Sequence, residues 1–208
     1  PSYIRKSGKA TCGVGYYWSG VAGKTKWGIE ISGIAAIDMD NHTAFHLEAV
    51  QTPNDLESGC LVSYYADVLI QRKESLQCLS KYVVADAYFS KYTFVSKLVD
   101  NEFEVVSRLR DDADLLYKYK GEQKTGRGRP KKYHGKVDYK NLEKQHITVI
   151  EENATHKVYQ VIVYSKSLKR DINLVVVYTN KKGTWRHKLY FSTDLELSAQ
   201  LVLTRIIH

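Results

Sequence analysis

The first quarter of the chain shows the alternation of apolar and polar positions that is typical of β-strands. Residues 27–37 are rich in Gly, Ile and Ala and carry little charge, which predicts a buried strand. Residues 45–49 alternate apolar with polar side chains, which predicts a half-buried strand. The polar cluster at 38–41 suits a tight turn, so we expect these two strands to form an antiparallel hairpin. Residues 2–6 are expected to be the end of an earlier strand.

Helical and strand patterns alternate in the next fifty residues. Apolar residues within 59–81 recur at three- and four-residue steps, which predicts a helix. The apolar run at 82–85 stops abruptly at Asp86, and an uninterrupted run predicts a strand buried on both faces, as in the centre of an α/β sheet. A second helix is expected over 90–101 and another strand over 103–109.

The pattern changes after Arg110. Residues 111–145 are polar and rich in lysine. Four apolar runs follow and are expected to form antiparallel strands joined by short turns, at 147–151, 158–164, 172–178 and 188–192. Ser198 is placed to cap a final helix.

This order of elements predicts an α/β protein with a mixed sheet. Three antiparallel strands followed by alternating helices and strands match the ribonuclease-H-like layout, here with a β-rich block after them, and several mixed α/β folds share parts of that order. We therefore expect a partial ribonuclease-H-like core at 1–110, a basic loop and β-rich insertion at 111–193, and the start of the final core helix at 194–208.

Composition excludes several classes of protein. The chain has 208 residues, 43% hydrophobic and 26% charged, which is the balance of a globular domain with or without an insertion. No apolar run approaches the roughly 20 residues that cross a bilayer, so no membrane partner is expected. The polar, basic residues 1–9 are unlike a signal peptide. Three cysteines, none in a CxxC pair, favour a reduced cytoplasmic setting without a zinc site.

The net charge of +8 is concentrated in one segment. Residues 118–144 hold ten basic side chains against three acidic ones, a net charge of +7. A positive segment beside a nearly neutral body favours a polyanionic partner, most often nucleic acid. The alternative is a solvated loop kept soluble by its lysines.

Few residues stand out as candidates for chemistry. Asp86 follows a predicted central strand, the place where α/β sheets position ligand-handling groups, and a helix cap is the equal alternative. Asp38 and Asp40 also follow a strand, but their cluster favours a turn. His42 and His46 have no third metal ligand nearby and are expected to face solvent. The chain contains no GxSxG, GxxxxGK[ST] or HExxH motif, which argues against the common hydrolases, NTPases and zincins.

The most specific part of the basic segment is Gly-Arg-Gly-Arg-Pro-Lys-Lys at 126–132. It resembles the AT-hook, in which an extended Arg-Gly-Arg segment enters a narrow A·T minor groove. Gly128 leaves no side chain to clash with the groove floor, and Pro130 holds the chain extended. The candidate DNA-binding residues here are Arg127, Arg129, Lys131 and Lys132. General phosphate binding and an inert loop are the alternatives.

Seven short strings occur in one particular order along the chain. They are Lys-Ser-Gly-Lys at 6–9, Gly-Val-Gly-Tyr-Tyr-Trp-Ser-Gly-Val-Ala-Gly at 13–23, Gly-Ile-Glu-Ile at 28–31, Gln-Thr-Pro at 51–53, Ala-Asp-Ala-Tyr-Phe at 85–89, Ser-Arg-Leu-Arg at 107–110 and Ser-Thr-Asp-Leu at 192–195. Together they resemble the DDE transposases of bacterial insertion sequences over essentially the whole chain.

The resemblance implies a ribonuclease-H-like core with a β-rich insertion between its second and third catalytic acids. In that family three carboxylates hold two divalent ions, normally Mg²⁺, which activate a water or a DNA 3′-hydroxyl for in-line attack on a phosphodiester. By motif, Asp86 is the second acid and a metal ligand. The first acid is expected just before residue 1 and the third beyond residue 208, because Asp38 and Glu196 lie at the wrong places. We therefore expect the chain alone to be inactive.

The same resemblance implies partners and a location. Double-stranded DNA is expected as transposon ends and target, with Arg108 and Arg110 as further DNA-binding candidates, and the intact enzyme is expected to form a homodimer. The expected location is the bacterial cytoplasm, at the nucleoid. The main alternative is a non-enzymatic DNA-binding module that uses the AT-hook-like loop, and a different ribonuclease-H-like nuclease is a further one.

Overall fold

A computed structural model describes the chain except residues 9, 124–127 and 208, and in the last helix it describes side chains only up to residue 203. The chain divides into two compact units, Pro1–Leu61 and Val62–His208. The elements confirm a mixed α/β protein that is rich in sheet. The predicted division after Arg110 stays a prediction.

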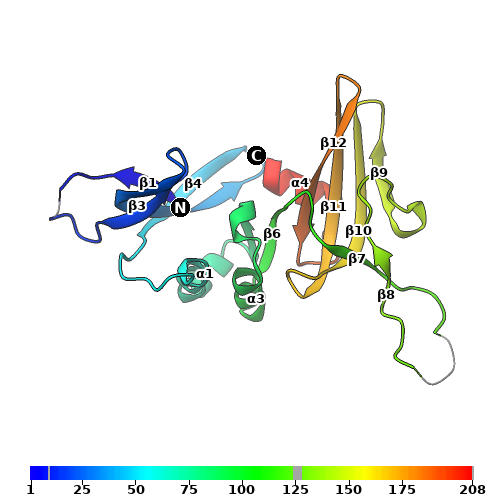
Figure 1. Cartoon of the computed structure of the whole chain (residues 1–208), viewed down its shortest axis with the longest axis horizontal. Coiled ribbons are helices and arrows are strands. Elements are labelled where there is room, and N and C mark those ends of the chain that lie inside the picture. The colour runs from blue at the N-terminus through cyan, green and yellow to red at the C-terminus, as the bar shows by residue number, and fades with distance from the viewer. Residues whose placement is uncertain (9, 124–127, 208) are drawn as a thin grey trace. The chain divides into compact units, whose positions relative to one another are not determined.

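The first unit is an antiparallel sheet of four strands. They are β1 (Ser2–Arg5), β2 (Gly15–Ser19), β3 (Lys24–Asp38) and β4 (Thr43–Gln51). Strand β3 pairs with the other three, which confirms the predicted hairpin with β4 and the short first strand. The turn between β3 and β4 also forms as predicted (Figure 1).

The burial of this hairpin differs from the prediction. Only the segment around Gly28–Glu30 of β3 is buried, and β4 is almost wholly exposed up to Val50. The apolar side chains of Phe45 and Leu47 are 58% and 43% exposed. The alternation of β4 is therefore correct as a strand signal but does not make the strand half-buried.

The second unit contains the helices. They are α1 (Leu61–Gln71), α2 (Lys73–Gln77), the 3₁₀ turn η1 (Ala87–Phe89), α3 (Tyr92–Asp100) and α4 (Ala199–Ile207). The helix predicted over 59–81 is thus interrupted at Arg72, which lies between α1 and α2. A second 3₁₀ turn, η2, spans Lys144–His146.

An eight-stranded mixed sheet forms the body of this unit. Its strands are β5 (Tyr82–Ala85), β6 (Glu104–Leu109), β7 (Leu115–Lys118), β8 (Tyr133–Lys136), β9 (Thr148–Glu152), β10 (His156–Ser165), β11 (Arg170–Lys181) and β12 (Thr184–Ser192). The order is β5-β6-β12-β11-β10-β7-β8, with β9 also paired to β10. Only β5 and β6 pair in parallel, and the long strands β10, β11 and β12 run side by side (Figure 1).

The position of β5 corrects the prediction of a central strand. It lies at one edge of the described sheet and pairs only with β6, and none of its residues is fully buried. Val84 is 37% exposed. The apolar run signalled a strand correctly, but tertiary pairing decided its place.

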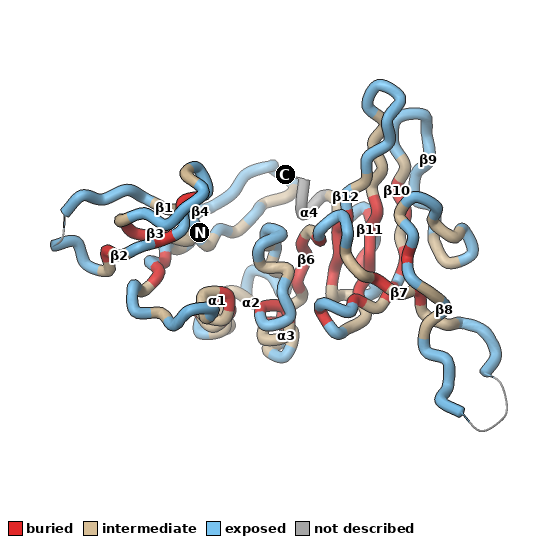
Figure 2. The backbone as a smooth tube through the Cα atoms, in the orientation of Figure 1, coloured by how far each residue is buried: buried red, intermediate tan, exposed pale blue. Residues whose placement is uncertain are grey.

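The core of the unit lies under α3 and α4. Helix α3 buries Phe94, Val95 and Leu98. Helix α4 begins where predicted, because the Ser198 hydroxyl accepts a hydrogen bond from the Leu201 amide at 3.3 Å. A continuous cluster of buried side chains joins α4 to the sheet, and it comprises Val106, Val158, Val175, Tyr190, Leu197, Ala199 and Val202. Figure 2 shows this burial concentrated in the middle of the long strands. No described helix is long and apolar enough to span a membrane.

Candidate functional site

The predicted catalytic acid, Asp86, lies just past the carboxyl end of β5. Its carboxylate is exposed, and Oδ1 accepts a hydrogen bond from the Tyr88 amide at 2.8 Å, so Asp86 is the N-cap of η1. Its backbone carbonyl accepts a hydrogen bond from the Ser107 hydroxyl on β6 at 3.1 Å. The structure therefore confirms the helix cap that the sequence predicted as one alternative. The carboxylate is also exposed, so it remains a candidate ligand.

The described residues do not supply Asp86 with the carboxylates that a pair of Mg²⁺ ions needs. Among them, the one group of three or more potential metal ligands lies elsewhere and contains two histidines. Asp194, the acid of the last resembling string, accepts a hydrogen bond from the Tyr82 hydroxyl at 2.6 Å, at the opposite end of β5. Hard divalent cations prefer several oxygen ligands, so the described residues do not fit such an ion, and we derive no step through it.

The arginines predicted at the end of β6 are paired with neighbouring acids. Arg108 Nη2 donates to Asp111 at 3.0 Å, and its buried Nε has no hydrogen-bond partner among the described atoms. Arg110 donates through Nε and Nη2 to Asp112 at 3.0 and 3.1 Å. These carboxylates neutralise much of the positive potential that would attract a phosphate.

The basic arm, residues 119–132, connects β7 to β8. Its base is closed by a hydrogen bond from the Tyr119 amide to the Lys132 carbonyl at 3.0 Å. The Gln123 amide group bonds the Lys131 carbonyl and amide, each at 2.9 Å. Lys131 Nζ also lies 4.8 Å from the centre of the Tyr119 ring. The described residues before and after 124–127 are therefore hydrogen-bonded to each other, as in a hairpin.

The described part of the AT-hook-like peptide, residues 128–132, lies on the β8 side of this arm. Arg127 is outside the described residues, whereas Arg129, Lys131 and Lys132 are all exposed (Figure 2). Gly128 has a φ of +158°, and a Cβ placed there would meet nothing within 4 Å, so packing does not demand glycine at this position. The arm therefore exposes the described basic residues of the peptide, Arg129, Lys131 and Lys132.

A hollow of about 350 Å³ lies on the same unit. Lys140, Lys144 and Lys157 line it together with aromatic side chains that include Trp185. Lys157 bonds Glu152 at 2.9 Å, and its Nζ lies 5.1 Å from the centre of the Trp185 ring. Lysines beside exposed aromatic faces suit a nucleic-acid backbone and its bases.

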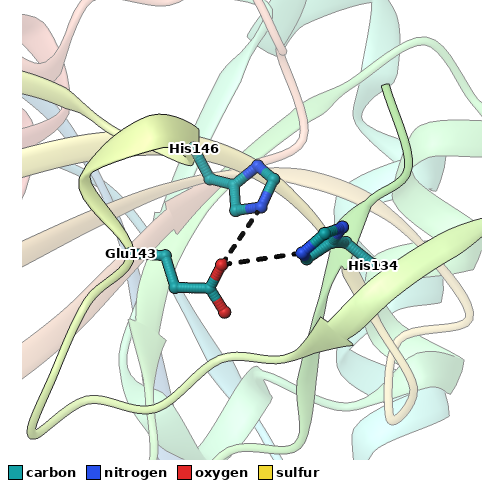
Figure 3. Close-up of side chains that lie close together, drawn as sticks. All are labelled: His134, Glu143 and His146. Carbon is teal, nitrogen blue, oxygen red and sulfur yellow. Dashed lines mark ion pairs between the residues drawn. The ribbon is translucent and has the colours of Figure 1, made fainter. Parts of the chain in front are cut away.

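Sequence reasoning missed a group formed by His134, Glu143 and His146. Their nitrogen and carboxylate ligand atoms all lie within 4.8 Å of one another (Figure 3). The spacing Glu-x-x-His at 143–146 was the available signal, but its partner His134 comes from a different element. His42 and His46, which the sequence analysis considered as metal ligands, belong to no metal-ligand group among the described residues.

No protein-family model matches this chain, and no curated protein is similar to it in sequence. The assignment of a function rests on its residues and their geometry.

Proposed function

We propose that the chain is part of the catalytic domain of a DDE-type DNA transposase and that it binds double-stranded DNA. The observation that carries the proposal is the exposed carboxylate of Asp86 at the carboxyl end of β5, within the string Ala-Asp-Ala-Tyr-Phe. The carboxyl ends of parallel strands are where α/β sheets present ligand-handling groups, and β5 and β6 form a parallel pair.

The order of elements supports a ribonuclease-H-like layout. An antiparallel set, β1 to β4, is followed by α1, β5, α3 and β6, and then by the antiparallel strands of the proposed insertion. The strands fall in two sheets, so the layout rests on order and on the parallel pair. For the intact enzyme, which carries two further acids, the same proposal includes two Mg²⁺ ions, a homodimer and a bacterial cytoplasmic location at the nucleoid.

The first experiment tests for strand cleavage. Incubating the chain with supercoiled plasmid and Mg²⁺ or Mn²⁺ is expected to give no nicking, because one carboxylate does not hold two ions in register. A longer product of the same reading frame that carries both further acids is expected to nick, and Asp86→Ala should abolish that activity. Glu151→Ala, which removes an exposed acid on β9, a strand paired with β10 and not with β5, is the control and should leave it unchanged.

Two results would contradict this assignment. Nicking by the present chain that Asp86→Ala removes would mean that other residues supply the ligands. A longer product whose nicking survives Asp86→Ala would remove Asp86 from the catalytic site.

A second candidate function is a DNA-binding module without catalysis. One observation favours this second function. Arg108 and Arg110 are paired with acids, whereas the described basic side chains of the arm are exposed. No ion pair joins Lys120, Arg129 or Lys132 to an acid among the described residues. Both candidate functions thus place DNA contact on the arm, and they differ in whether a longer product cuts.

The second experiment measures where DNA binds. Replacing Lys120, Arg129 and Lys132 with glutamine is expected to weaken duplex binding and to reduce the slope of log affinity against log salt by about 2.7, since each phosphate contact contributes about 0.9. Fluorescence anisotropy across a salt series measures both quantities.

The matched control changes the same charge elsewhere. Lys73, Lys97 and Lys166 each pair with an acid of the same unit, and their replacement with glutamine should alter the slope much less. Equal losses in the two triple variants would show that net charge alone attracts DNA. An unchanged slope in the arm variant would place the DNA surface elsewhere, with the lysine-lined hollow as the next candidate.

A further inference from the structure

The group of His134, Glu143 and His146 unites three potential metal ligands at the base of the basic arm. His146 Nε2 lies 3.4 Å from Glu143 Oε2, and His134 Nε2 lies 3.7 Å from the same oxygen. Figure 3 shows both imidazoles directed at this one carboxylate oxygen. The two histidine rings are themselves only 4.7 Å apart, centre to centre.

Local backbone structure places each side chain. The register of β7 and β8 shifts between Tyr117 and Lys118, which face Gly135 and Tyr133, so His134 is the extra residue of a β-bulge. Bulges re-aim side chains and are frequent beside functional sites. Glu143 occupies the N-cap position of η2 and His146 is its last residue. Residues three apart in a 3₁₀ turn lie on the same side.

The packing around His146 fixes the site on its inner side. The His146 side chain is only 10% exposed, and its ring stacks on buried Tyr117 at 4.7 Å with an interplanar angle of 26°. His134 and Glu143 are more open, at 38% and 42% exposed. One ligand is thus largely buried against Tyr117, and the other two are more open to solvent.

The distances from Glu143 to the two histidines fit a small divalent ion. Nitrogen and oxygen ligands lie about 2.0–2.1 Å from tetrahedral Zn²⁺, which puts neighbouring ligand atoms roughly 3.4 Å apart. The His146–Glu143 distance already equals that spacing, and the His134–Glu143 distance exceeds it by a few tenths of an ångström.

The ligand set also selects the class of metal. Imidazole nitrogen suits Zn²⁺, Cu²⁺, Ni²⁺ and Co²⁺, whereas Mg²⁺ and Ca²⁺ take oxygen ligands. Two histidines and one carboxylate therefore disfavour the ion expected from the transposase resemblance. The cysteine pattern predicted no zinc site, and none of the three cysteines belongs to this group.

We propose that His134, Glu143 and His146 bind one Zn²⁺ ion. Three protein ligands leave a fourth position to water or to an external ligand. The ion joins β8 to η2 and so ties down the chain on which the basic arm stands. The proposal does not depend on the DNA-binding function, because it rests on this geometry alone.

A simpler arrangement competes with this proposal. The Gln145 amide donates to Glu143 Oε2 at 2.9 Å, and both histidines can hydrogen-bond the carboxylate without any metal. A group held only by hydrogen bonds would bind zinc no better than scattered surface histidines do. Direct measurement of metal binding therefore distinguishes the zinc site from this arrangement.

The experiment titrates ZnCl₂ into the metal-free chain by isothermal calorimetry. One Zn²⁺ per chain is expected, and MgCl₂ at the same concentration should give no signal. Loss of an outer-shell partner already weakens metal sites 10- to 100-fold, so His134→Ala, His146→Ala and Glu143→Gln should each weaken binding by at least about tenfold. His156→Ala, an exposed histidine of the same unit outside the group, is the matched control and should bind as the parent does.

Two further measurements keep the test decisive. A variant with Cys12, Cys60 and Cys78 all replaced by serine should retain the stoichiometry, and loss of zinc there would overturn the proposal in favour of thiol ligands. Co²⁺ should give the visible absorption of a four-coordinate site in the parent and in Cys-free protein but not in Glu143→Gln, whose fold is checked by circular dichroism. Absence of zinc binding at about 100 µM, or equal binding by all three ligand variants, would also overturn it.

Discussion

At the scale of the residue, single aspartate side chains stabilise the turns that the sequence predicted. Asp38 Oδ1 accepts hydrogen bonds from the amides of Asp40 and Asn41 at 3.1 and 3.2 Å, which confirms the turn interpretation. Asp86 bonds the amide two residues ahead in the same way. Aspartate does this with its own nearby backbone, so no tertiary information is needed to predict it.

Other side chains act over long sequence separations. Buried Asn173 donates to the Leu197 carbonyl at 2.6 Å and accepts from Gln160 at 2.9 Å. Gln160 in turn donates to the same carbonyl at 2.9 Å. This network fixes the segment that follows the Ser-Thr-Asp-Leu string and leads into α4.

Asp194 in that string gives a prediction about acid stability. The Tyr82 hydroxyl at 2.6 Å, together with Lys81, lowers the pKa of Asp194 below its ordinary value of 3.8. A lowered pKa in the folded state contributes stability above pH 3.8 that is lost as pH falls through the folded pKa. Asp194→Asn should therefore lower the free energy of unfolding at pH 7 by about 1–3 kcal/mol, because a hydrogen bond to a charged group is lost.

Urea denaturation across pH measures this effect. The difference between parent and Asp194→Asn should shrink as pH falls below about 4. Asp112→Asn removes a carboxylate whose side chain is 72% exposed and should cost less than about 1 kcal/mol. A difference for Asp194→Asn that stays constant down to the lowest pH at which the chain folds would show that shape, and not charge, makes the contribution.

At the scale of elements, most apolar or alternating runs were predictable, but the two short strands inside the lysine-rich segment were not. Strands β10, β11 and β12 coincide with predicted runs, whereas β7 and β8 lie within the segment expected to be a polar loop. Each of these two strands has only four residues, and β8 reads Tyr-His-Gly-Lys. Pairing with β10 and with each other, and not side-chain pattern, makes them strands.

Helix α4 gives a prediction at this scale. Val202 is fully buried in the cluster against the sheet, while its neighbour Leu201 is 40% exposed. Val202→Ala should lower the free energy of unfolding by about 1–3 kcal/mol through lost burial and a residual cavity. Leu201→Ala removes more atoms but should cost less than about 1 kcal/mol, as measured by urea denaturation. The reverse order would mean that α4 packs through another face.

At the scale of the whole molecule, positive charge is concentrated in one segment, and this gives a prediction about which DNA sequences the chain prefers. If Arg129 and Arg127, the latter outside the described residues, enter a narrow minor groove, replacing both with lysine keeps the charge but should selectively reduce A·T preference. Guanidinium sheds water more readily than ammonium in a narrow groove of negative potential. We expect the loss on an A·T-rich duplex to exceed that on a G·C-rich duplex severalfold.

Competition binding at one salt concentration compares the two duplexes. Lys73 and Lys97, both ion-paired, serve as control positions, and their replacement with arginine should leave the ratio of affinities unchanged. Equal losses on both duplexes would mean that the arm contacts only phosphates. That outcome would remove the AT-hook interpretation and leave the proposal for Asp86 in place.

The sequence by itself determined the mixed α/β class, most element positions, the local caps and the concentration of charge, because each depends on neighbours a few residues apart. Tertiary structure alone decided that β5 lies at an edge and that Phe45 and Leu47 stay exposed, whereas Arg108 and Arg110 pair with acids only three and two residues further along the chain. It also decided the group at the base of the arm. A bulge in β8 turns His134 toward Glu143 and His146. The bulge depends on how β8 pairs with β7, and no spacing of residues along the chain reveals that register.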